Sequence, residues 1–285
     1  MDAPATIATI GNMGIVPEAI DFRPGTGRLY AIDVGTTTTQ LYAVNRNTAA
    51  VTPVGPGFPT AVAGAGGYVL NNQVGFDFNP RTLMPDGSVR IRVVATNNTN
   101  LRLNSDTGLV AAVDVPLAIG TNSPFVDGIA YINSNASTDG AAGTTTLFDL
   151  DTRNDALYIQ NPPNNGSLTL VGPLGATVDA LVGVGFDIFT EPGSTDDSIG
   201  GDRGLAVFRR GDTAGGQYLL YDVNLATGQV TNGRLVGGGI DFAGGFAVVP
   251  EPSTGLALLA LPAAAALARR RCTGRRGTPT TPCTR

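Results

Sequence analysis

A triplet of one aspartate between two apolar residues recurs along the chain, at Asp21, Asp77, Asp187 and Asp241. Carboxylates that converge on one channel could bind a cation or a sugar, or act as the acid and base of a hydrolase. Alternatively, each carboxylate accepts backbone N–H bonds at the start of an inner strand and fixes a turn. A residue type that recurs in nearly every repeat usually serves the repeat, so we favour this structural role.

Three arginines form a second candidate site: Arg90, Arg92 and Arg102 lie on segments that we expect to be neighbouring strands. Guanidinium groups gathered in this way could bind an anion such as a uronate or a phosphate. The alternative, which we favour, is that they pair with strand carboxylates such as Asp77 or Asp106, because buried arginine needs partners.

Residues 191–202 contain four carboxylates, and Asp196, Asp197 and Asp202 are weak candidate ligands for Ca²⁺. Their spacing lacks the alternation of an EF-hand loop, so we favour an ordinary solvated loop and expect no cofactor. Residues 161–164, Asn-Pro-Pro-Asn, could form a rim loop for a ligand or a rigid connection.

Composition excludes several kinds of chemistry. The chain has no histidine, and its two cysteines, Cys272 and Cys283, follow the C-terminal apolar segment. Serine–histidine and cysteine–histidine nucleophiles and ordinary zinc hydrolysis are therefore excluded, which leaves carboxylate acid–base chemistry or a calcium-assisted lactonase-like site. The part before Glu251 carries 12 arginines and 22 acidic residues, so nucleic acid is a poor partner.

The candidate residues belong to a repeat. Asp21, Asp77, Ala130 in a weaker copy (Gly128–Tyr131), Asp187 and Asp241 follow one another at 56, 53, 57 and 54 residues. A second element, a hydrophobic strand followed by Asn and Thr-Gly, recurs at 101–110 and 220–230, with a looser copy at 41–51. Its Asn104–Gly108 and Asn224–Gly228 segments predict type I turns closed by a left-handed glycine.

Each unit reads as four short strands. The predicted strands of the first two units are 19–22, 28–32, 40–45 and 50–54, then 75–79, 89–95, 100–104 and 109–113. Val89, Ile91 and Val93 should share one face, opposite Arg90 and Arg92. Four strands in about 50 residues predict an all-β, β-propeller-like domain with about five blades. The fifth blade, begun at Gly239, is incomplete. A β-sandwich is the alternative.

The C-terminal region from Val249 to Arg271 has three parts: Pro250-Glu251-Pro252, an uncharged apolar stretch from Thr254 to Ala268, and Arg269-Arg270-Arg271. Fifteen helical residues span roughly 22 Å, enough to anchor in a membrane with local thinning. The three arginines would act as a stop-transfer signal and keep their side cytoplasmic, which places the body outside. A C-terminal apolar helix docked on the domain is the alternative.

This order of elements resembles the PEP-CTERM sorting signal of Gram-negative bacteria. The resemblance implies recognition and cleavage by an integral-membrane exosortase at the inner membrane, and export alongside exopolysaccharide. The expected divisions are a repeat domain at 1–248, a sorting and anchor segment at 249–271 and a disordered tail at 272–285. The N-terminal MDAPATIATIG has no signal-peptide pattern, so we expect that the natural protein begins earlier.

The body is similar to a bacterial family, domain of unknown function 4394. The segments that carry the resemblance are AIDFRPGTGRLYAI (19–32), QLYAVNRNTAAVTPVG (40–55), GFDFNP (75–80), RIRVVATNNTNLRLNSDTG (90–108), YIQNPPNNGSLTLVGPLG (158–175) and LYDVNLATGQV (220–230). The resemblance implies an exported, propeller-like domain with no established activity and no catalytic residues to carry over.

We therefore expect an exported surface or biofilm-matrix protein, a noncatalytic binding or structural propeller that contacts exopolysaccharide. It would be anchored in the inner membrane until processed and then released to the cell surface or the medium. The alternative is a propeller hydrolase acting on lactones or glycans with channel carboxylates, with calcium as its one conceivable cofactor.

Overall fold

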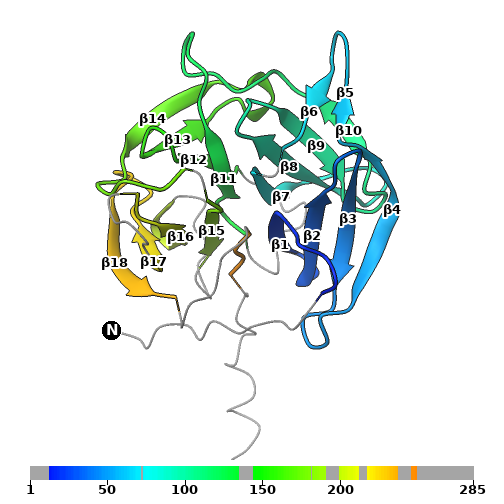
Figure 1. Cartoon of the computed structure of the whole chain (residues 1–285), viewed down its shortest axis with the longest axis horizontal. Coiled ribbons are helices and arrows are strands. Elements are labelled where there is room, and N and C mark those ends of the chain that lie inside the picture. Colours follow the sequence, from blue (N-terminus) through cyan, green and yellow to red (C-terminus); the bar gives the residue numbers. More distant parts are fainter. Residues whose placement is uncertain are drawn as a thin grey trace, which may run out of the picture. The chain divides into compact units, whose positions relative to one another are not determined.

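The computed structural model describes residues 13–71, 73–134, 144–180, 182–190, 199–211, 217–236 and 245–248. These residues form four antiparallel sheets of four strands each, and a separate two-stranded hairpin. In Figure 1 the first strand of each sheet, β1, β7, β11 or β15, lies near the centre and the fourth strand lies at the rim. This radial arrangement confirms the predicted all-β, propeller-like fold.

The strands follow one another in chain order within each blade. Blade 1 holds β1 (Ala19–Arg23), β2 (Arg28–Val34), β3 (Thr38–Val44) and β4 (Val51–Pro59). Blade 2 holds β7 (Val74–Leu83), β8 (Val89–Ala95), β9 (Asn100–Asn104) and β10 (Val110–Val113), after the hairpin β5 (Ala61–Val62) and β6 (Tyr68–Val69). Blade 3 holds β11 (Val126–Tyr131), β12 (Leu147–Asp151), β13 (Ala156–Gln160) and β14 (Leu168–Pro173), with a 3₁₀ turn η1 (Pro163–Asn165) between the last two. Blade 4 holds β15 (Gly185–Thr190), β16 (Asp202–Arg209), β17 (Tyr218–Val223) and β18 (Val230–Leu235), with η2 (Ile199–Gly201) before β16.

All eight strands predicted for the first two units are present. The main differences are that β4 continues to Pro59 and β7 to Leu83. The predicted turns also form: Gly108 and Gly228 have φ of 67° and 80°, and the amide N–H of each donates to the carbonyl of the asparagine four residues earlier. In the looser copy, Ala49 takes the same position at φ 62°.

The core lies between the blades, where the faces of neighbouring sheets pack against each other. Val89, Ile91 and Val93 pack in the cluster between blades 1 and 2, as the alternation in β8 predicted. The inner strand β7 lies against both β1 and β11, and β11 also lies against β15. A second large cluster fills the space between blades 3 and 4.

The predicted fifth triplet, with Asp241, lies outside the described residues, and no fifth sheet occurs in the described ranges. Instead, residues 245–248, Gly-Phe-Ala-Val, lie between blade 4 and blade 1. Phe246 and Val248 pack against the blade 4 cluster, whereas Ala247 packs against the blade 1 cluster. This alternation repeats the pattern of inner strands such as β15, which begins Gly185-Phe186-Asp187-Ile188.

All the described residues belong to one compact unit, which ends at residue 250. The predicted sorting motif Pro250–Pro252, the stop-transfer arginines Arg269–Arg271 and the apolar helix between them lie outside the described residues. Within the described ranges, no helix is long and apolar enough to cross a membrane.

Candidate functional site

The three described repeat carboxylates lie on the inner strands and connect neighbouring blades. Asp21 on β1 accepts a hydrogen bond of 3.0 Å from the backbone N–H of Phe78 on β7. Asp77 in turn accepts from the N–H of Tyr131 on β11, and Asp187 on β15 accepts from the N–H of Val248. These side chains therefore bond to the next inner segment around the axis.

Their electrostatics follow from burial, since Asp21, Asp77 and Asp187 are 4%, 2% and 6% exposed. Burial raises the pKa of Asp21 to about 6, although a hydrogen bond with Asp77 partly opposes this shift. Burial raises the pKa of Asp77 well above its usual range, and the nearby Asp21 and Asp187 charges raise it further. Both shifts favour the protonated form of the coupled Asp21–Asp77 pair.

The axis beside these carboxylates is closed by packing. The first two residues of each inner segment, such as Gly75-Phe76 and Gly245-Phe246, surround a cavity of only about 10 Å³. A Cβ atom on Gly128 would lie 2.9 Å from the Phe186 Cβ, so the segments approach closely because glycine stands there. Asp21, Asp77 and Asp187 line neither this cavity nor the two larger ones described below.

The weak calcium candidates are only partly visible, since Asp196 and Asp197 lie outside the described residues. Asp202, at the start of β16, accepts hydrogen bonds at its Oδ1 from the N–H of Asn133 at 3.0 Å and from the hydroxyl of Thr190 at 2.6 Å. That oxygen therefore connects blades 3 and 4. The described residues contain no group of three or more acidic residues that could hold a metal ion.

The three arginines singled out in the sequence do come together. They line one cavity of about 300 Å³ between blades 2 and 3, which we call the arginine pocket. Its lining residues are Asn79, Arg90, Arg92, Arg102, Tyr131, Pro163 and Asn164. The β-sheet register sets this arrangement: β8 and β9 are neighbours, Arg92 pairs with Arg102, and Arg90 pairs with Asn104.

One carboxylate holds two of these arginines, and it is Asp114 rather than Asp77 or Asp106. Arg92 Nη1 lies 2.6 Å from Asp114 Oδ2, and Arg102 reaches both oxygens of Asp114 at 2.8 Å. Both partners in the Arg92–Asp114 pair are buried, with side chains 3% and 6% exposed. Asp106 pairs with Arg23 instead.

Residues from blade 3 complete the arginine pocket. Asn164, in the predicted Asn161–Asn164 loop, accepts a hydrogen bond of 2.7 Å from Arg92 Nη2 at its Oδ1. Burial raises the pKa of Tyr131, although Arg92 opposes the shift, so its hydroxyl is a neutral hydrogen-bonding group. Burial also raises the pKa of Asp149 well above its usual range, despite the nearby charge of Arg92.

Sequence reasoning did not identify Asp114 as a site residue, although the register of the β9–β10 hairpin could have indicated it. Ala112 pairs with Arg102, and side chains two residues apart on a strand share a face, so the position of Asp114 follows from the hairpin register. Tyr131 appeared only as the end of the weaker repeat, and nothing in the sequence indicated that Asn79 would join the same cavity.

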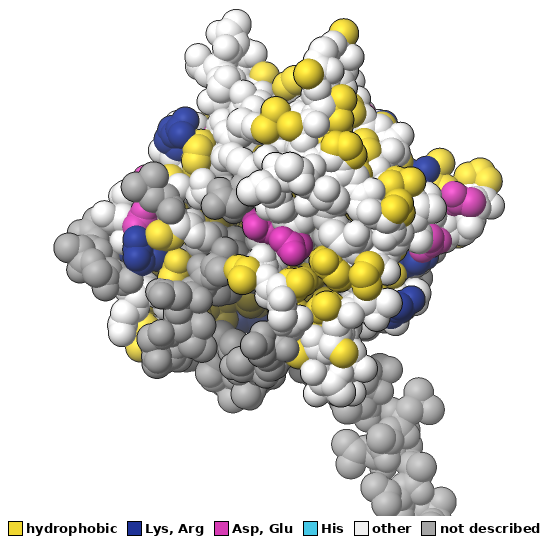
Figure 2. Space-filling model, turned by 45° about the vertical axis from the view of Figure 1, so that its right-hand side comes forward, with side chains coloured by type: hydrophobic (Ala, Val, Ile, Leu, Met, Phe, Trp, Pro, Cys, Tyr) yellow, Lys and Arg dark blue, Asp and Glu magenta, His cyan; other side chains and the backbone are white. Residues whose placement is uncertain are grey.

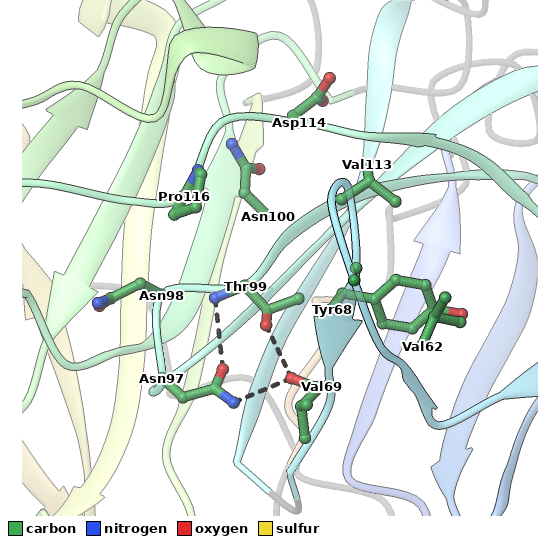
Figure 3. A pocket seen from close by; sticks show the side chains of 12 residues that line it. Val62, Tyr68, Val69, Asn97, Asn98, Thr99, Asn100, Val113, Asp114 and Pro116 are labelled. Atoms are coloured by element: carbon green, nitrogen blue, oxygen red, sulfur yellow. Dashed lines mark hydrogen bonds between the residues drawn. The ribbon is translucent and has the colours of Figure 1, made fainter.

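A second cavity of about 320 Å³, the hairpin groove, lies between the β5–β6 hairpin, the β8–β9 turn and the segment from the end of β10 to Pro116 (Figure 3). Thr99 Oγ1 and Asn97 Nδ2 both donate to the carbonyl of Val69, which ties the hairpin to the β8–β9 turn. Val62 and Val69 on the hairpin are 41% and 50% exposed. Hydrophobic side chains follow this protruding hairpin in Figure 2, whereas charged side chains are scattered over the face shown.

Comparison with solved structures gives only distant matches. Hydrazine synthase of Kuenenia stuttgartiensis is 13% identical, with 83% of this chain and 53% of that chain covered and a TM-score of 0.38, so the chain spans about half its length. A proposed exo-β-1,3-galactanase from Bifidobacterium bifidum is 12% identical, with 74% and 69% covered and a TM-score of 0.44. A proposed 6-phosphogluconolactonase from Bacteroides uniformis is 12% identical, with 78% and 72% covered and a TM-score of 0.36. Likeness at this level transfers neither an activity nor a ligand.

Comparison with curated protein sequences gave no match. Two family models do match the chain. The PEP-CTERM protein-sorting motif matches residues 248–271, which marks an exported protein with a C-terminal sorting signal that an exosortase processes. The model described as domain of unknown function (DUF4394) matches residues 3–244, nearly the whole body. The chain is therefore a member of the DUF4394 family that carries a PEP-CTERM sorting signal.

Proposed function

We propose that this protein is a noncatalytic binding module of the cell surface or extracellular matrix, and that its arginine pocket takes an acidic group of an extracellular polymer. The observation that carries the proposal is the gathering of Arg90, Arg92 and Arg102 in one cavity, with a single carboxylate, Asp114, paired with Arg92 and Arg102. Because the body is acidic as a whole, this concentration of positive charge stands out from its surroundings.

The physical reason is electrostatic. Three guanidinium groups and one carboxylate leave the pocket with a net positive charge, and like charges held close together repel one another. An anionic ligand would relieve that repulsion by forming charge-assisted hydrogen bonds in a partly enclosed cavity. Acidic exopolysaccharide is a polymer of this chemistry in the compartment to which the sorting signal directs the protein.

The route to that compartment is part of the proposal. Arg269–Arg271 would stop transfer at the inner membrane and leave the body outside, with the apolar residues 254–268 as a temporary anchor. Exosortase cleavage near Pro250–Pro252 would then release the body to the cell surface or the medium, where it would contact the polysaccharide matrix of a biofilm.

A hydrolase is the second candidate because Asp21 and Asp77 lie side by side and the pKa of Asp21 is raised to about 6, as in an acid–base pair. Against it, both carboxylates are buried and accept backbone N–H bonds, and none of the three cavities reaches them. Release of reducing sugar from a bound polymer, lost in D21N, would favour the hydrolase.

We also propose that Gly245–Val248 is the inner strand of a fifth blade. Three features support this assignment: the hydrogen bond from Val248 to Asp187, the packing of alternate residues against blades 4 and 1, and the inclusion of Gly245 and Phe246 in the ring at the axis. The fifth copy of the repeat would then centre on Ala247, which takes the position predicted for Asp241.

The test is an array of acidic and neutral polysaccharides probed with the full chain in mild detergent. We expect binding to uronate-rich polymers and not to neutral glucans, and binding should weaken as salt is raised because exposed charges are screened beyond about 10 Å at 0.1 M. R102Q should weaken the signal, whereas R46Q, a change at an exposed arginine outside the pocket, should not. Equal binding to neutral and acidic polymers would contradict the proposal.

A further inference from the structure

The arginines of the pocket differ in how many of their N–H groups already donate hydrogen bonds to the protein. Arg92 Nη1 donates to Asn100 and Asp114, and its Nη2 donates to Asn164. Arg102 makes a two-bond fork with Asp114. Both guanidinium groups are therefore held by the protein before any ligand arrives.

Arg90 is different. Its Nη1 donates to the hydroxyl of Ser88 at 3.0 Å, and no carboxylate lies within 4.0 Å of its guanidinium among the described residues. Asp86 accepts a hydrogen bond from the same Ser88 hydroxyl, and the Arg90 charge helps to lower its pKa, but the Asp86 carboxylate is itself exposed to water. Most of the N–H donors of Arg90 are therefore available to a ligand in the pocket.

One available guanidinium favours a ligand group with one negative charge. A planar carboxylate matches the planar fork of arginine and can accept two parallel N–H bonds. A phosphate monoester carries nearly two charges at neutral pH, and its second charge would have to compete with Asp114 for Arg92 or Arg102.

The rest of the lining suits neutral hydroxyl groups. Asn164 uses its Oδ1 to accept from Arg92, so the N–H groups of its amide remain as donors. Asn79 Oδ1 accepts a hydrogen bond from the backbone N–H of Arg81. The amide nitrogen of Asn79 is therefore the group that faces the Tyr131 hydroxyl. The cavity of about 300 Å³ lies at the small end of ligand sites, which fits one sugar ring rather than a long segment.

We propose that the arginine pocket recognises one hexuronic acid residue, with the Arg90 guanidinium binding its carboxylate and Asn79, Tyr131 and Asn164 binding its hydroxyl groups. Arg92 and Arg102 are positioning residues that Asp114 holds in place. This inference rests on the proposed function, and it narrows the acidic group to a carboxylate on a sugar.

The test is calorimetric titration of the full chain in mild detergent with methyl β-glucuronide, methyl β-glucoside and glucose 6-phosphate. The glucoside differs from the glucuronide by a neutral CH₂OH in place of the carboxylate, and the phosphate tests a second charge. We expect the glucuronide to bind more tightly than both.

The variant R90Q keeps an amide donor but removes the charge, and we expect it to weaken glucuronide binding about 10- to 100-fold, the value of one charge-assisted pair. R90K keeps the charge without the fork and should fall between R90Q and the wild type. R46Q should bind as the wild type does. D114N frees Arg92 and Arg102, so it should shift preference toward glucose 6-phosphate, a change that a merely structural role of Asp114 would not produce.

The outcomes separate the two proposals. Acidic polymers that bind the wild type and R90Q equally, with no glucuronide binding, would overturn the uronate inference and leave the proposed function standing. Tighter binding of glucose 6-phosphate than of glucuronide to the wild type would overturn the single-charge argument. Absence of binding to any acidic polymer or sugar would remove both proposals.

Discussion

At the scale of single residues, Asp114 is the carboxylate that joins two arginines of the pocket. It lies just after β10 and accepts hydrogen bonds from Arg92 and Arg102, whose backbones pair directly across β8 and β9. Without the carboxylate, two like charges would face each other in a largely buried site. A buried pair of this kind adds little beyond the cost of desolvation, but its loss leaves uncompensated charge.

We therefore expect D114N to lower the free energy of unfolding by about 3 kcal/mol. Urea unfolding followed by circular dichroism measures the change. The matched control is D106N, which breaks the Arg23–Asp106 pair, whose carboxylate is 47% exposed; we expect it to change stability by about 1 kcal/mol or less. Similar losses in both variants would show that burial of the Asp114 pair does not matter.

At the scale of elements, the inner segments determine how the blades meet. Each described aspartate of the repeat bonds to the next inner segment, and glycines at 75, 128 and 245 allow close approach there. Gly245 has φ of 72°, and a Cβ atom at this position would lie 2.7 Å from both the Ala19 Cα and the Ile20 backbone nitrogen. The seam between blades 4 and 1 therefore depends on the absence of a side chain at residue 245.

We expect G245A to lower the free energy of unfolding by about 3 kcal/mol, since left-handed strain and overpacking both contribute. Gly14 provides the control because it has the same φ of 72°, but a Cβ atom there would meet no other atom within 4 Å. G14A should therefore cost only the strain, about 1 kcal/mol. Thermal and urea unfolding measure both changes. If G245A and G14A lower stability equally, Gly245–Val248 does not close against β1.

At the scale of the whole molecule, several acidic groups lie inside an already acidic protein. Asp21, Asp77 and Asp187 come from three different blades, and the fourth inner strand contributes the uncharged Ala130 at the same position. Burial comes first among the causes that raise the pKa of each aspartate. Because the folded state binds protons more tightly than the unfolded chain does, folding is favoured at low pH.

The sign of the pH dependence follows from these shifts. The stability from the raised carboxyl pKa values is fully present below about pH 4. It is lost as the pH rises from there through the folded-state values, so the part that Asp21 contributes is gone by about pH 6. Asp21 alone accounts for about 3 kcal/mol across this range.

We therefore expect the thermal midpoint to fall as the pH rises above about 4, by about 2–4 °C for each kcal/mol lost. D77N removes one of the coupled groups whose pKa is raised well above its usual range, so it should flatten the curve and raise the midpoint at pH 8. D106N, at an exposed position, should keep the wild-type slope. A midpoint that rises toward pH 8 in the wild type would contradict the assignment of raised pKa values.

The strand pattern and the repeat could be predicted from the sequence because both depend on local chemistry. Alternation of apolar and polar residues sets the faces of β8, and the Asn-to-Gly segments at 104–108 and 224–228 form their turns without help from distant residues. The sorting signal is equally local, since its motif, apolar stretch and arginines are adjacent in the chain.

Only the tertiary structure decided how distant residues meet. The sequence alone could not show that Arg90, Arg92 and Arg102 share a cavity with Tyr131 and Asn164, because those residues belong to another blade. Nor could it show that Gly245–Val248, rather than the Asp241 triplet, bonds to Asp187. Contacts between blades depend on the twist and packing of whole sheets, whereas turns and strand faces depend on residues a few positions apart.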